Sequence, residues 1–467
     1  MTPRVVWALV TIACVQASGC STFRSYETEL SETSQQLGSG NVEGALALLE
    51  KNNSSADKDL LYYFEKGELL RAKGDLTGSQ VAWREADQVI YAWEEAVKAD
   101  PNKYLGEVGS FLINDKVRRY EGYDYEKVML TTQMALNDVA LHDFDSARTE
   151  IKKTHEREAL IAELRDKQYL DQEQEAEEQG VTTEYKDLQG YPVEALNDPE
   201  VTGLKNSYQS AFSHYLSGFV YEALGEKGLA APGYRKAIEL RPDTPLLEQA
   251  LLNLDRPIKG KKIADSDVLL VVQTGLAPAR NSLRIPLPIP TNDGLIIAPL
   301  SFPLMTPDTS TPSFSSVELD GRTLELTELS SIDAMSRRAL RDDMPGIILR
   351  TTLRAATRAV AQKQLNEENP WAGLALGIAS AITEGADERT WRTLPDNIQV
   401  ARLNLSKGTH RLSLPAVYGV TEVEITIKDK FQVIPLRVVG TQVFASGNAT
   451  RVTPPVVGQA LADAAQP

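Results

Sequence analysis

The sequence of 467 residues contains only two cysteines, Cys14 and Cys20, and both lie close to its beginning. The long remainder of the chain has no residue with which to form a disulfide bond or a thiolate metal site. Its stability must therefore come from packing and hydrogen bonding. Hydrophobic residues make up 42% of the chain, and a chain of this length is expected to fold as two or three domains.

Histidine is also scarce, and the motifs of several enzyme classes are missing. No metal-ligand spacing links the four histidines, which are His142, His155, His214 and His410. The sequence has no glycine-rich nucleotide loop and no nucleophile elbow. Asp387, Glu388 and Arg389 could suggest a carboxylate pair with a cation, but adjacent residues in a helix or strand do not share a face. We therefore interpret Asp387 and Arg389 as structural. The sequence predicts a protein that is not an enzyme and has no metal, cofactor or catalytic residue.

Positive charge and long hydrophobic runs are in short supply as well. Lysine and arginine together number 49 against 65 aspartates and glutamates, which gives a formal net charge of −16. Nucleic-acid binding requires a concentrated basic face, so we expect no nucleic-acid partner. After the first twenty residues, no apolar run reaches the length of about 18 residues that a membrane-spanning helix needs.

What the sequence does have is an N-terminal segment of the kind that directs export. Arg4 precedes an apolar run from Val5 to Val15, and Ala17-Ser18-Gly19-Cys20 follows. The run is too short to remain as a membrane span, and small residues precede the cysteine. The segment resembles the signal peptide of a bacterial lipoprotein. An ordinary secretory peptide with a chance cysteine is the alternative.

The lipoprotein resemblance implies that residues 1–19 are removed and that Cys20 is the lipidation site, acylated on its sulfur and on its new amino group. Several acyl chains, palmitate among them, make a lasting membrane anchor where one is marginal. Ser21 follows the cysteine, where an aspartate would, by resemblance to Gram-negative lipoproteins, retain the protein at the inner membrane. We therefore predict an outer-membrane, lipid-anchored protein that faces the periplasm.

Residues 20–254 are predicted to form an α-solenoid of tetratricopeptide-like helical hairpins. The clearest copy, near 211–244, has the small, aromatic and proline positions of such a repeat at Gly218, Tyr221, Gly225, Ala230, Tyr234, Ala237 and Pro242. A second copy near 60–93 keeps Gly67, Gly74, Trp83 and Ala86, with Ser79 in place of alanine. A degenerate copy near 128–161 keeps Ala135, Ala147 and Ile151. The segment 158–200 is rich in charged and amide residues and is predicted to be an acidic linker, which up to about Glu184 is either an exposed helical extension or partly disordered.

Three tyrosines, Tyr120, Tyr123 and Tyr125, lie within six residues before the degenerate copy. Aromatic side chains supply much of the energy of protein interfaces, so a partner contact on the concave face of the hairpins is one interpretation. The other is that they pack neighbouring hairpins together, which is the commoner use of aromatics in repeat stacks.

From 255 to 453 the pattern changes to that of a mainly antiparallel β domain. The run Val268–Thr274 predicts a buried strand, and residues 317–326 alternate around Asp320-Gly321 as in a hairpin. Prolines between 282 and 312 predict edge strands and extended loops, with Pro286–Pro290 as a loop. Runs at 398–405, 409–414, 421–427 and 431–439 predict a four-stranded antiparallel meander. Residues 454–467 are predicted to be a loose tail.

A helical insertion is predicted at 332–385 within the β domain. One helix is expected from Ile332 to Arg341 and a second from Pro345 to Gln364, because proline suits the first turn of a helix.

Arg350, Arg354 and Arg358 stand four residues apart in the second of these helices and so line one face. One interpretation is contact with an anionic surface, namely lipid headgroups, cell-wall carboxylates or an acidic protein patch. The alternative is a solvated face whose arginines pair with the chain's own carboxylates.

Two stretches resemble signature segments of a family of proteobacterial tetratricopeptide-repeat lipoproteins. They are Tyr120-Glu121-Gly122 with Tyr125–Leu130, and Ala386–Pro395. The resemblance spans nearly the whole mature chain. Genes of that family often lie near those of small lipoproteins that activate peptidoglycan synthases, so the resemblance implies an envelope role without assigning a biochemical activity.

Three functions remain open. The first is a scaffold that binds envelope protein partners in cell-envelope assembly, including that of peptidoglycan. The others are a component of an export or surface-assembly apparatus and an envelope carbohydrate-active hydrolase. A pocket with converging carboxylates of raised pKa would favour the hydrolase, and an aromatic groove would favour the scaffold.

Overall fold

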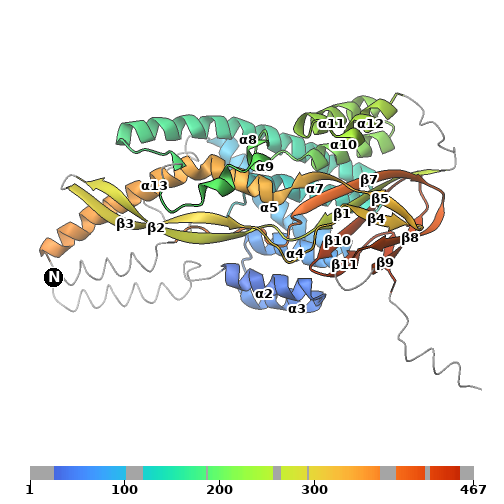
Figure 1. Ribbon diagram of the computed structural model, residues 1–467, viewed down its shortest axis with the longest axis horizontal. Coiled ribbons are helices and arrows are strands. Elements are labelled where there is room, and N and C mark those ends of the chain that lie inside the picture. The colour runs from blue at the N-terminus through green and yellow to red at the C-terminus, as the bar shows by residue number, and fades with distance from the viewer. Residues whose placement is uncertain are drawn as a thin grey trace, which may run out of the picture.

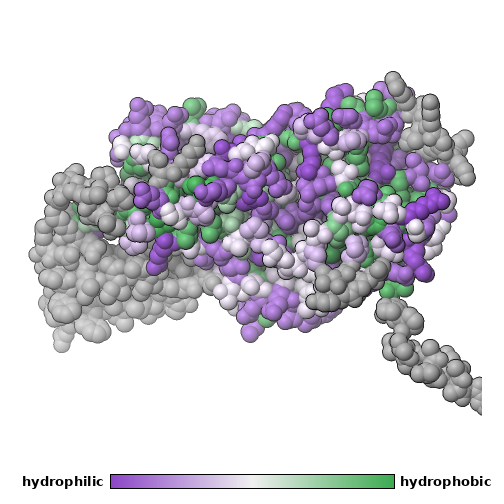
Figure 2. Space-filling model, in the orientation of Figure 1, coloured by the Kyte–Doolittle hydropathy of each residue, from purple (hydrophilic) through white to green (hydrophobic). Residues whose placement is uncertain are grey.

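The computed structural model describes residues 26–100, 119–185, 188–255, 265–291, 294–368, 385–415 and 421–452. The predicted signal peptide 1–19, the lipidation site Cys20 and the predicted tail 454–467 lie outside these residues and remain predictions. Along the described chain, helices come first and strands later, as expected. Hydrophilic residues predominate on the face drawn in Figure 2, in keeping with the charged composition.

The helices of the first half form hairpins (Figure 1). The hairpins are α2 (Tyr26–Gly38) with α3 (Val42–Asn52), α4 (Leu60–Ala72) with α5 (Leu76–Ala99), α7 (Asp124–Ala140) with α8 (Phe144–Gln179), and α10 (Ala211–Ala223) with α11 (Lys227–Leu240). Shorter helices are η4 (Val193–Leu196), α9 (Pro199–Thr202) and α12 (Pro245–Asn253). Each of the three predicted repeats therefore contains a helical hairpin.

A small residue on the first helix faces a large one on the second in all three of these hairpins. A Cβ added to Gly218 would lie 2.5 Å from the Tyr234 ring, and one added to Gly67 would lie 2.1 Å from the Trp83 ring. The aromatic side chain thus fills the space above the glycine, which lets the helices approach closely. The degenerate hairpin has buried Ala135 and Ile151 at the equivalent places.

The strands form three sheets, and every described strand pair except β1 with β10 is antiparallel. The central sheet has the order β11-β10-β1-β7-β6, with β1 (Ser266–Thr274), β6 (Thr327–Ser331), β7 (Asn397–Leu405), β10 (Phe431–Val439) and β11 (Gln442–Ala445). The outer sheet has the order β12-β9-β8-β4-β5, with β4 (Ser316–Leu319), β5 (Arg322–Glu325), β8 (Gly408–Leu414), β9 (Thr421–Ile427) and β12 (Ala449–Arg451). Strands β4 and β5 form the hairpin predicted around Asp320-Gly321.

The central sheet lies between the helices and the outer sheet. The even-numbered residues of β1 from 268 to 272 share a core with the outer sheet. Leu269 and Val271 point the other way and share a core with Met129 of α7 and Phe212 of α10. All nine residues of β1 are therefore buried, as predicted for Val268–Thr274. One hydrophobic core joins the helical half of the chain to the β half.

The first helices of two hairpins are buried on all sides. Every residue from Tyr125 to Ala140 in α7 and from Ala211 to Tyr221 in α10 is buried. Helix α7 packs on β10 and α10 on β6, while α8 and α11 cover their other sides. The face of the hairpins on which we expected a partner is thus covered by the chain's own central sheet.

The remaining two strands, β2 (Ala279–Thr291) and β3 (Gly294–Thr306), form a separate ribbon where we expected a loop at Pro286–Pro290. In an antiparallel ladder, pairs that exchange hydrogen bonds alternate with pairs that do not. Pro286, Pro288 and Pro290 occupy alternate positions, and Pro299 and Pro303 pair with residues of the same alternate set. Because all these prolines fall in one of the two alternating sets of residue pairs, the other set can form all of its ladder hydrogen bonds. The two-stranded ribbon can therefore contain several prolines.

The prediction of two separate helices within 332–364 is wrong. Residues 332–368 form one helix, α13 (Ile332–Glu368), with Pro345 in its interior. A proline removes one helical hydrogen bond but does not end a helix that is held by packing on either side. That packing comes from the ribbon and from α8, which lie beside α13 and extend with it away from the larger sheets (Figure 1).

The predicted four-stranded meander is also wrong. The four strands exist, but β8 and β9 pair in the outer sheet whereas β7 and β10 flank β1 in the central sheet. Strand β10 pairs with β1, which lies far earlier in the chain, rather than with its neighbour β9. A local sequence pattern predicts strands but carries no information about such distant partners.

Of the two forms expected for the start of the acidic segment 158–200, the structure has the helical extension. Helix α8 continues to Gln179 as an exposed extension of its hairpin. Beyond it, Leu188, Tyr191 and Leu196 are buried in a core with the ribbon and α13. A few apolar side chains in a polar segment therefore hold it to the body of the protein.

Candidate functional site

A cleft of about 220 Å³ lies where five separate parts of the chain meet. The start of α7, the middle of α8, the centre of α13, the ribbon and the segment 385–389 all contribute side chains. The cleft brings together two sets of residues that the sequence singled out, because Tyr120 and Tyr123 line it with Arg350 and Arg354. Tyr125 and Arg358 are not among its lining residues.

The three tyrosines form one aromatic cluster at the start of α7. Tyr120 and Tyr125 are buried, and Tyr123 is partly exposed. The Tyr123 ring stacks on Tyr125 with the centroids 5.9 Å apart and meets Tyr120 edge-on at 6.0 Å. This burial favours the packing interpretation for Tyr120 and Tyr125, whereas Tyr123 keeps surface toward the cleft.

Two buried glutamates hold the second signature stretch, Ala386–Pro395, against the helices. Glu126 of α7 accepts hydrogen bonds from the Trp391 backbone N–H at 2.7 Å and from the Thr390 hydroxyl at 3.0 Å. Glu65 of α4 accepts from the backbone N–H groups of Arg392 at 2.6 Å and Thr393 at 3.2 Å. Each glutamate accepts more than one hydrogen bond from this segment, so the two stretches, far apart in sequence, form one unit.

The same segment is fixed by an aromatic side chain and an ion pair. The fully buried Trp391 ring stacks on Phe64 with the centroids 4.5 Å apart and meets Trp83 edge-on at 5.9 Å. Arg389 donates twice to the Asp387 carboxylate, at 2.8 and 2.7 Å. Asp387 and Arg389 therefore shape one edge of the cleft, in agreement with the structural role predicted for them.

Helix α13 provides the opposite wall of the cleft. Arg354 is buried, and Arg350 and Arg358 are partly exposed. The solvated-face interpretation does not fit Arg350, because no carboxylate of the described residues is within ion-pair distance and its Nε atom is buried without an acceptor. Arg165 of α8 joins both walls, since it pairs with Asp124 of α7 at 2.6 Å and with Asp343 of α13.

Arg280 of β2 is the lining residue that sequence reasoning missed. It is only 6% exposed, and its guanidinium lies 4.6 Å from the centre of the Tyr123 ring. Its Nε donates to the Asp387 carbonyl oxygen at 2.9 Å. No local spacing marks Arg280, because it reaches the cleft only through the pairing of the ribbon and its docking beside α13.

The cleft is basic although the protein is acidic. Among the described lining residues, seven are cationic, namely Arg119, Lys127, Arg165, Arg280, Arg350, Arg354 and Arg389. Four are acidic, namely Glu121, Asp124, Asp343 and Asp387. Burial raises the pKa of the Asp124 carboxyl, but Arg165 and Lys127 together outweigh burial and hold that pKa below its ordinary value. Asp124 is therefore an ionised partner of the cations and is poorly suited to donate a proton.

The described residues contain no group of three or more His, Cys, Asp or Glu side chains that could hold a metal ion. None of the described helices combines the length and the apolar character of a membrane span.

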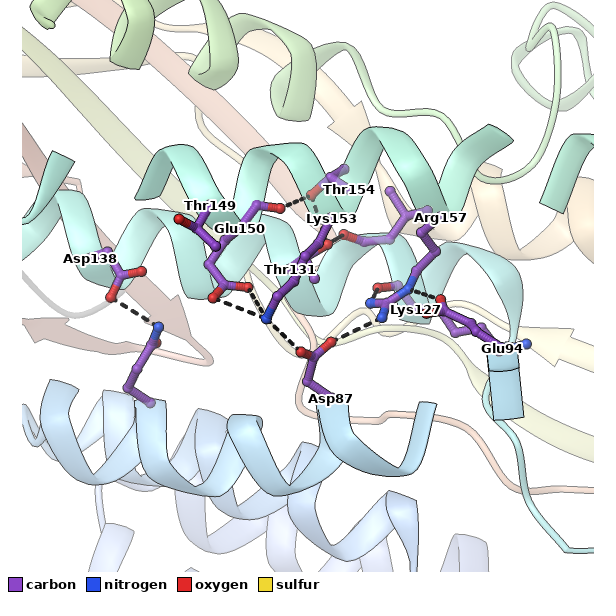
Figure 3. Close-up of polar contacts among 12 residues, drawn as sticks. Asp87, Glu94, Lys127, Thr131, Asp138, Thr149, Glu150, Lys153, Thr154 and Arg157 are labelled. Carbon is purple, nitrogen blue, oxygen red and sulfur yellow. Dashed lines mark hydrogen bonds and ion pairs between the residues drawn. The ribbon is translucent and has the colours of Figure 1, made fainter. Parts of the chain in front are cut away.

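A second polar cluster lies between α5 and α8 and has a structural role (Figure 3). Arg157 bonds to Asp87 at 2.9 Å and to Glu94 at 2.5 Å, and Lys153 bonds to Asp87 at 2.8 Å. Arg157 also donates to the Lys127 carbonyl oxygen at 2.9 Å, which ties α7 to the same cluster. Its two cations are satisfied by the chain's own acceptors, so the cluster holds hairpins together rather than offering a site.

A larger cavity of about 520 Å³ shares Arg165 with the cleft. It is lined by the aromatic residues Tyr169, Tyr185 and Tyr208 and by Arg338 and Arg341. Its arginines already have partners, because Arg338 pairs with Asp342 at 2.9 Å and Arg341 donates to the Tyr185 hydroxyl at 3.1 Å. The smaller cleft is therefore the better candidate for a binding site.

Comparison with known proteins adds little to this picture. No protein-family model and no curated protein matches the sequence. Among solved structures, the chain matches a tetratricopeptide repeat protein from Parabacteroides merdae with 14% identity and a TM-score of 0.13, over 50% of this chain and 99% of that one. At that TM-score the match carries no argument, and the description of the hairpins rests on their own packing.

Proposed function

We propose that this protein is a lipid-anchored scaffold of the bacterial cell envelope, tethered by Cys20 to the periplasmic face of the outer membrane. The helical hairpins stack as a tetratricopeptide-like solenoid, which the recurring small-to-large packing of Gly67 with Trp83 and Gly218 with Tyr234 supports. The scaffold binds an envelope protein partner at the cleft.

The observation that carries this proposal is the convergence of tyrosines and arginines on the cleft from five parts of the chain. Tyrosine and arginine are the residues most enriched at the energetic centres of interfaces. The inner face of the hairpins is covered by the central sheet, so among the described surfaces we place recognition at the cleft. Because Arg165 ties α8 to both α7 and α13 across the cleft, little ordering cost opposes binding.

The hydrolase alternative receives less support. Paired acid and base catalysis needs one carboxyl that keeps its proton near neutral pH. Three of the four described carboxylates that line the cleft are paired with arginines, since Asp124 and Asp343 pair with Arg165 and Asp387 pairs with Arg389. A carboxylate that is paired with an arginine favours its ionised form, so these three groups position cations rather than donate protons.

Site-specific photo-crosslinking in cells tests the scaffold. A photoreactive residue is placed at Tyr123 or at Arg350 of the full-length lipoprotein, and captured proteins are identified in the outer-membrane fraction. We expect the same envelope protein from both positions. Tyr91 of α5, which is 58% exposed and lies outside the cleft, is the matched control position and should not capture it. Equal capture from Tyr91, or none from the cleft positions, would argue against the proposal.

A further inference from the structure

The floor of the cleft presents donors that the described chain does not fully satisfy. Arg280 is 6% exposed, and no carboxylate of the described chain lies within ion-pair distance of it. The Arg350 Nε atom is buried with no hydrogen-bond partner. The hydroxyl of Ser301, which is 5% exposed, is likewise buried with no partner. All three line the cleft, and all three can donate.

These donors are fixed in place from different directions. Arg280 is paired with Met305 in the ribbon, and Ser301 is paired with Arg284, so the side chains of Arg280 and Ser301 leave the same face of the ribbon. Arg350 comes from α13, on the opposite wall. The Tyr123 ring at 4.6 Å and the Asp387 carbonyl oxygen hold the Arg280 guanidinium in one orientation. A guanidinium that is already held in one orientation loses little conformational entropy when it binds an oxyanion.

Burying a cation without a counterion is costly, and an unsatisfied buried donor adds to the cost. Elsewhere in this chain, buried arginines have carboxylate partners, as Arg437 has Glu68 at 2.9 Å and Arg157 has Asp87 at 2.9 Å. Arg280 has no carboxylate bond of this kind within the described chain and donates instead to the Asp387 carbonyl oxygen and the Met305 sulfur. The Arg350 Nε has no acceptor at all among the described residues, and this contrast indicates that an external anion completes the site.

We propose that the cleft binds a phosphate ester through Arg280, Ser301 and Arg350. A planar carboxylate is satisfied by one bidentate arginine, whereas a tetrahedral phosphate offers oxygens in several directions and matches donors from separate walls. The volume of the cleft, about 220 Å³, is many times what a single bound water needs, so the cleft can admit a phosphate with part of its substituent. This inference takes the location of the site from the proposed function and names the group recognised there.

Two sources of the phosphate are distinguished in solution. The full-length lipoprotein, in a detergent that carries no phosphate, is titrated calorimetrically with glycerol phosphate and with short-chain phosphatidylglycerol. Tighter binding of the lipid identifies a headgroup as the ligand, and equal binding identifies a soluble phosphate ester. Succinate is the carboxylate comparison and is expected to bind at least tenfold more weakly than glycerol phosphate.

Variants assign the binding to the proposed donors. Arg350→Gln is expected to weaken glycerol phosphate binding about tenfold or more, Arg350→Lys to weaken it less, and Ser301→Ala to weaken it several-fold. Arg322→Gln, on the exposed strand β5 of the outer sheet, makes the same chemical change away from the cleft and should leave the affinity unchanged. Circular dichroism of each variant establishes that it is folded.

The proposal is overturned if glycerol phosphate does not bind saturably, if succinate binds as tightly, or if the folded Arg350→Gln and Ser301→Ala variants keep full affinity. Because this titration contains no protein partner, its failure leaves the crosslinking result standing. A failure to capture a partner likewise leaves the phosphate titration intact.

Discussion

Glu65 shows how much a single buried residue contributes to this fold. Its side chain is fully buried, and burial raises its pKa to about 7 from an ordinary value of 4.5 although Thr393 and two backbone N–H groups donate to it. The folded protein therefore holds this proton more tightly than the unfolded chain does. The stabilising contribution of the group is complete below about pH 4.5 and is lost as the pH rises through about 7.

Glu65→Gln removes this titration. Since one unit of pKa difference corresponds to about 1.4 kcal/mol, we expect the free energy of unfolding of the natural protein to fall between pH 5 and pH 8 by on the order of 1–3 kcal/mol more than that of the variant. Denaturant unfolding of both proteins at several pH values measures how the free energy of unfolding of each changes with pH.

The control for this prediction is Glu43→Gln, whose carboxylate is 71% exposed on α3 and which should follow the natural protein. Some pH dependence will remain in Glu65→Gln, because burial also raises the pKa of Asp138 and of Asp396 to about 7. Parallel curves for the natural protein and Glu65→Gln would contradict the prediction.

At the residue scale, the sequence indicated part of the cleft and could not indicate the rest. The clustering of Tyr120 and Tyr123 and the four-residue spacing of Arg350 and Arg354 are local patterns, and both pairs line the cleft. Arg280 lies in a proline-rich strand with no such pattern. Its position depends on a pairing and a docking that involve residues far away in the chain.

Among the elements, the hairpins were the most predictable. Three of their turns have the same local structure. A residue with positive φ, at Gly74, His142 or Gly225, is followed by an acidic residue at which the second helix begins. Short-range constraints of this kind leave a trace in the sequence. For the sheets, the sequence predicted the strands but not their pairing. The pairing depends on how the two faces of β1 are buried, which involves residues far apart in the chain.

The small-to-large packing of the hairpins gives a prediction for one element. An added Cβ at Gly218 would lie 2.5 Å from the Tyr234 ring. Gly218→Ala must therefore displace a buried aromatic side chain, and we expect it to lower the free energy of unfolding by about 1–3 kcal/mol, measured by thermal or denaturant unfolding.

Gly228→Ala is the matched control on the partner helix α11. A Cβ at Gly228 would meet nothing within 4 Å, so the substitution is expected to leave stability unchanged or raise it by up to about 1 kcal/mol, because alanine favours helix. Equal effects of the two substitutions on stability would show that the packing of the Tyr234 ring does not require a glycine at position 218.

For the whole molecule, the main consequence is that the helical and β halves stabilise each other. The core that contains Met129 and Phe212 of the helices also contains Leu269 and Val271 of the central sheet. Trp391, from the β half of the sequence, lies between Phe64 and Trp83 of α4 and α5. The boundary that the composition places near residue 255 therefore separates two kinds of secondary structure that share one core.

Trp391→Ala tests this coupling. Removing a fully buried indole from a core is expected to cost about 3–5 kcal/mol. Because the core is shared, hydrogen exchange should become faster in α4 and in β10 by the same factor, and unfolding should remain a single transition by circular dichroism and fluorescence. Trp93→Ala removes an indole that is only partly buried on α5 and should cost less. If α4 kept its protection while β10 lost its own, the two halves would be independent, and the rigid cleft on which both proposals depend would lose its physical basis.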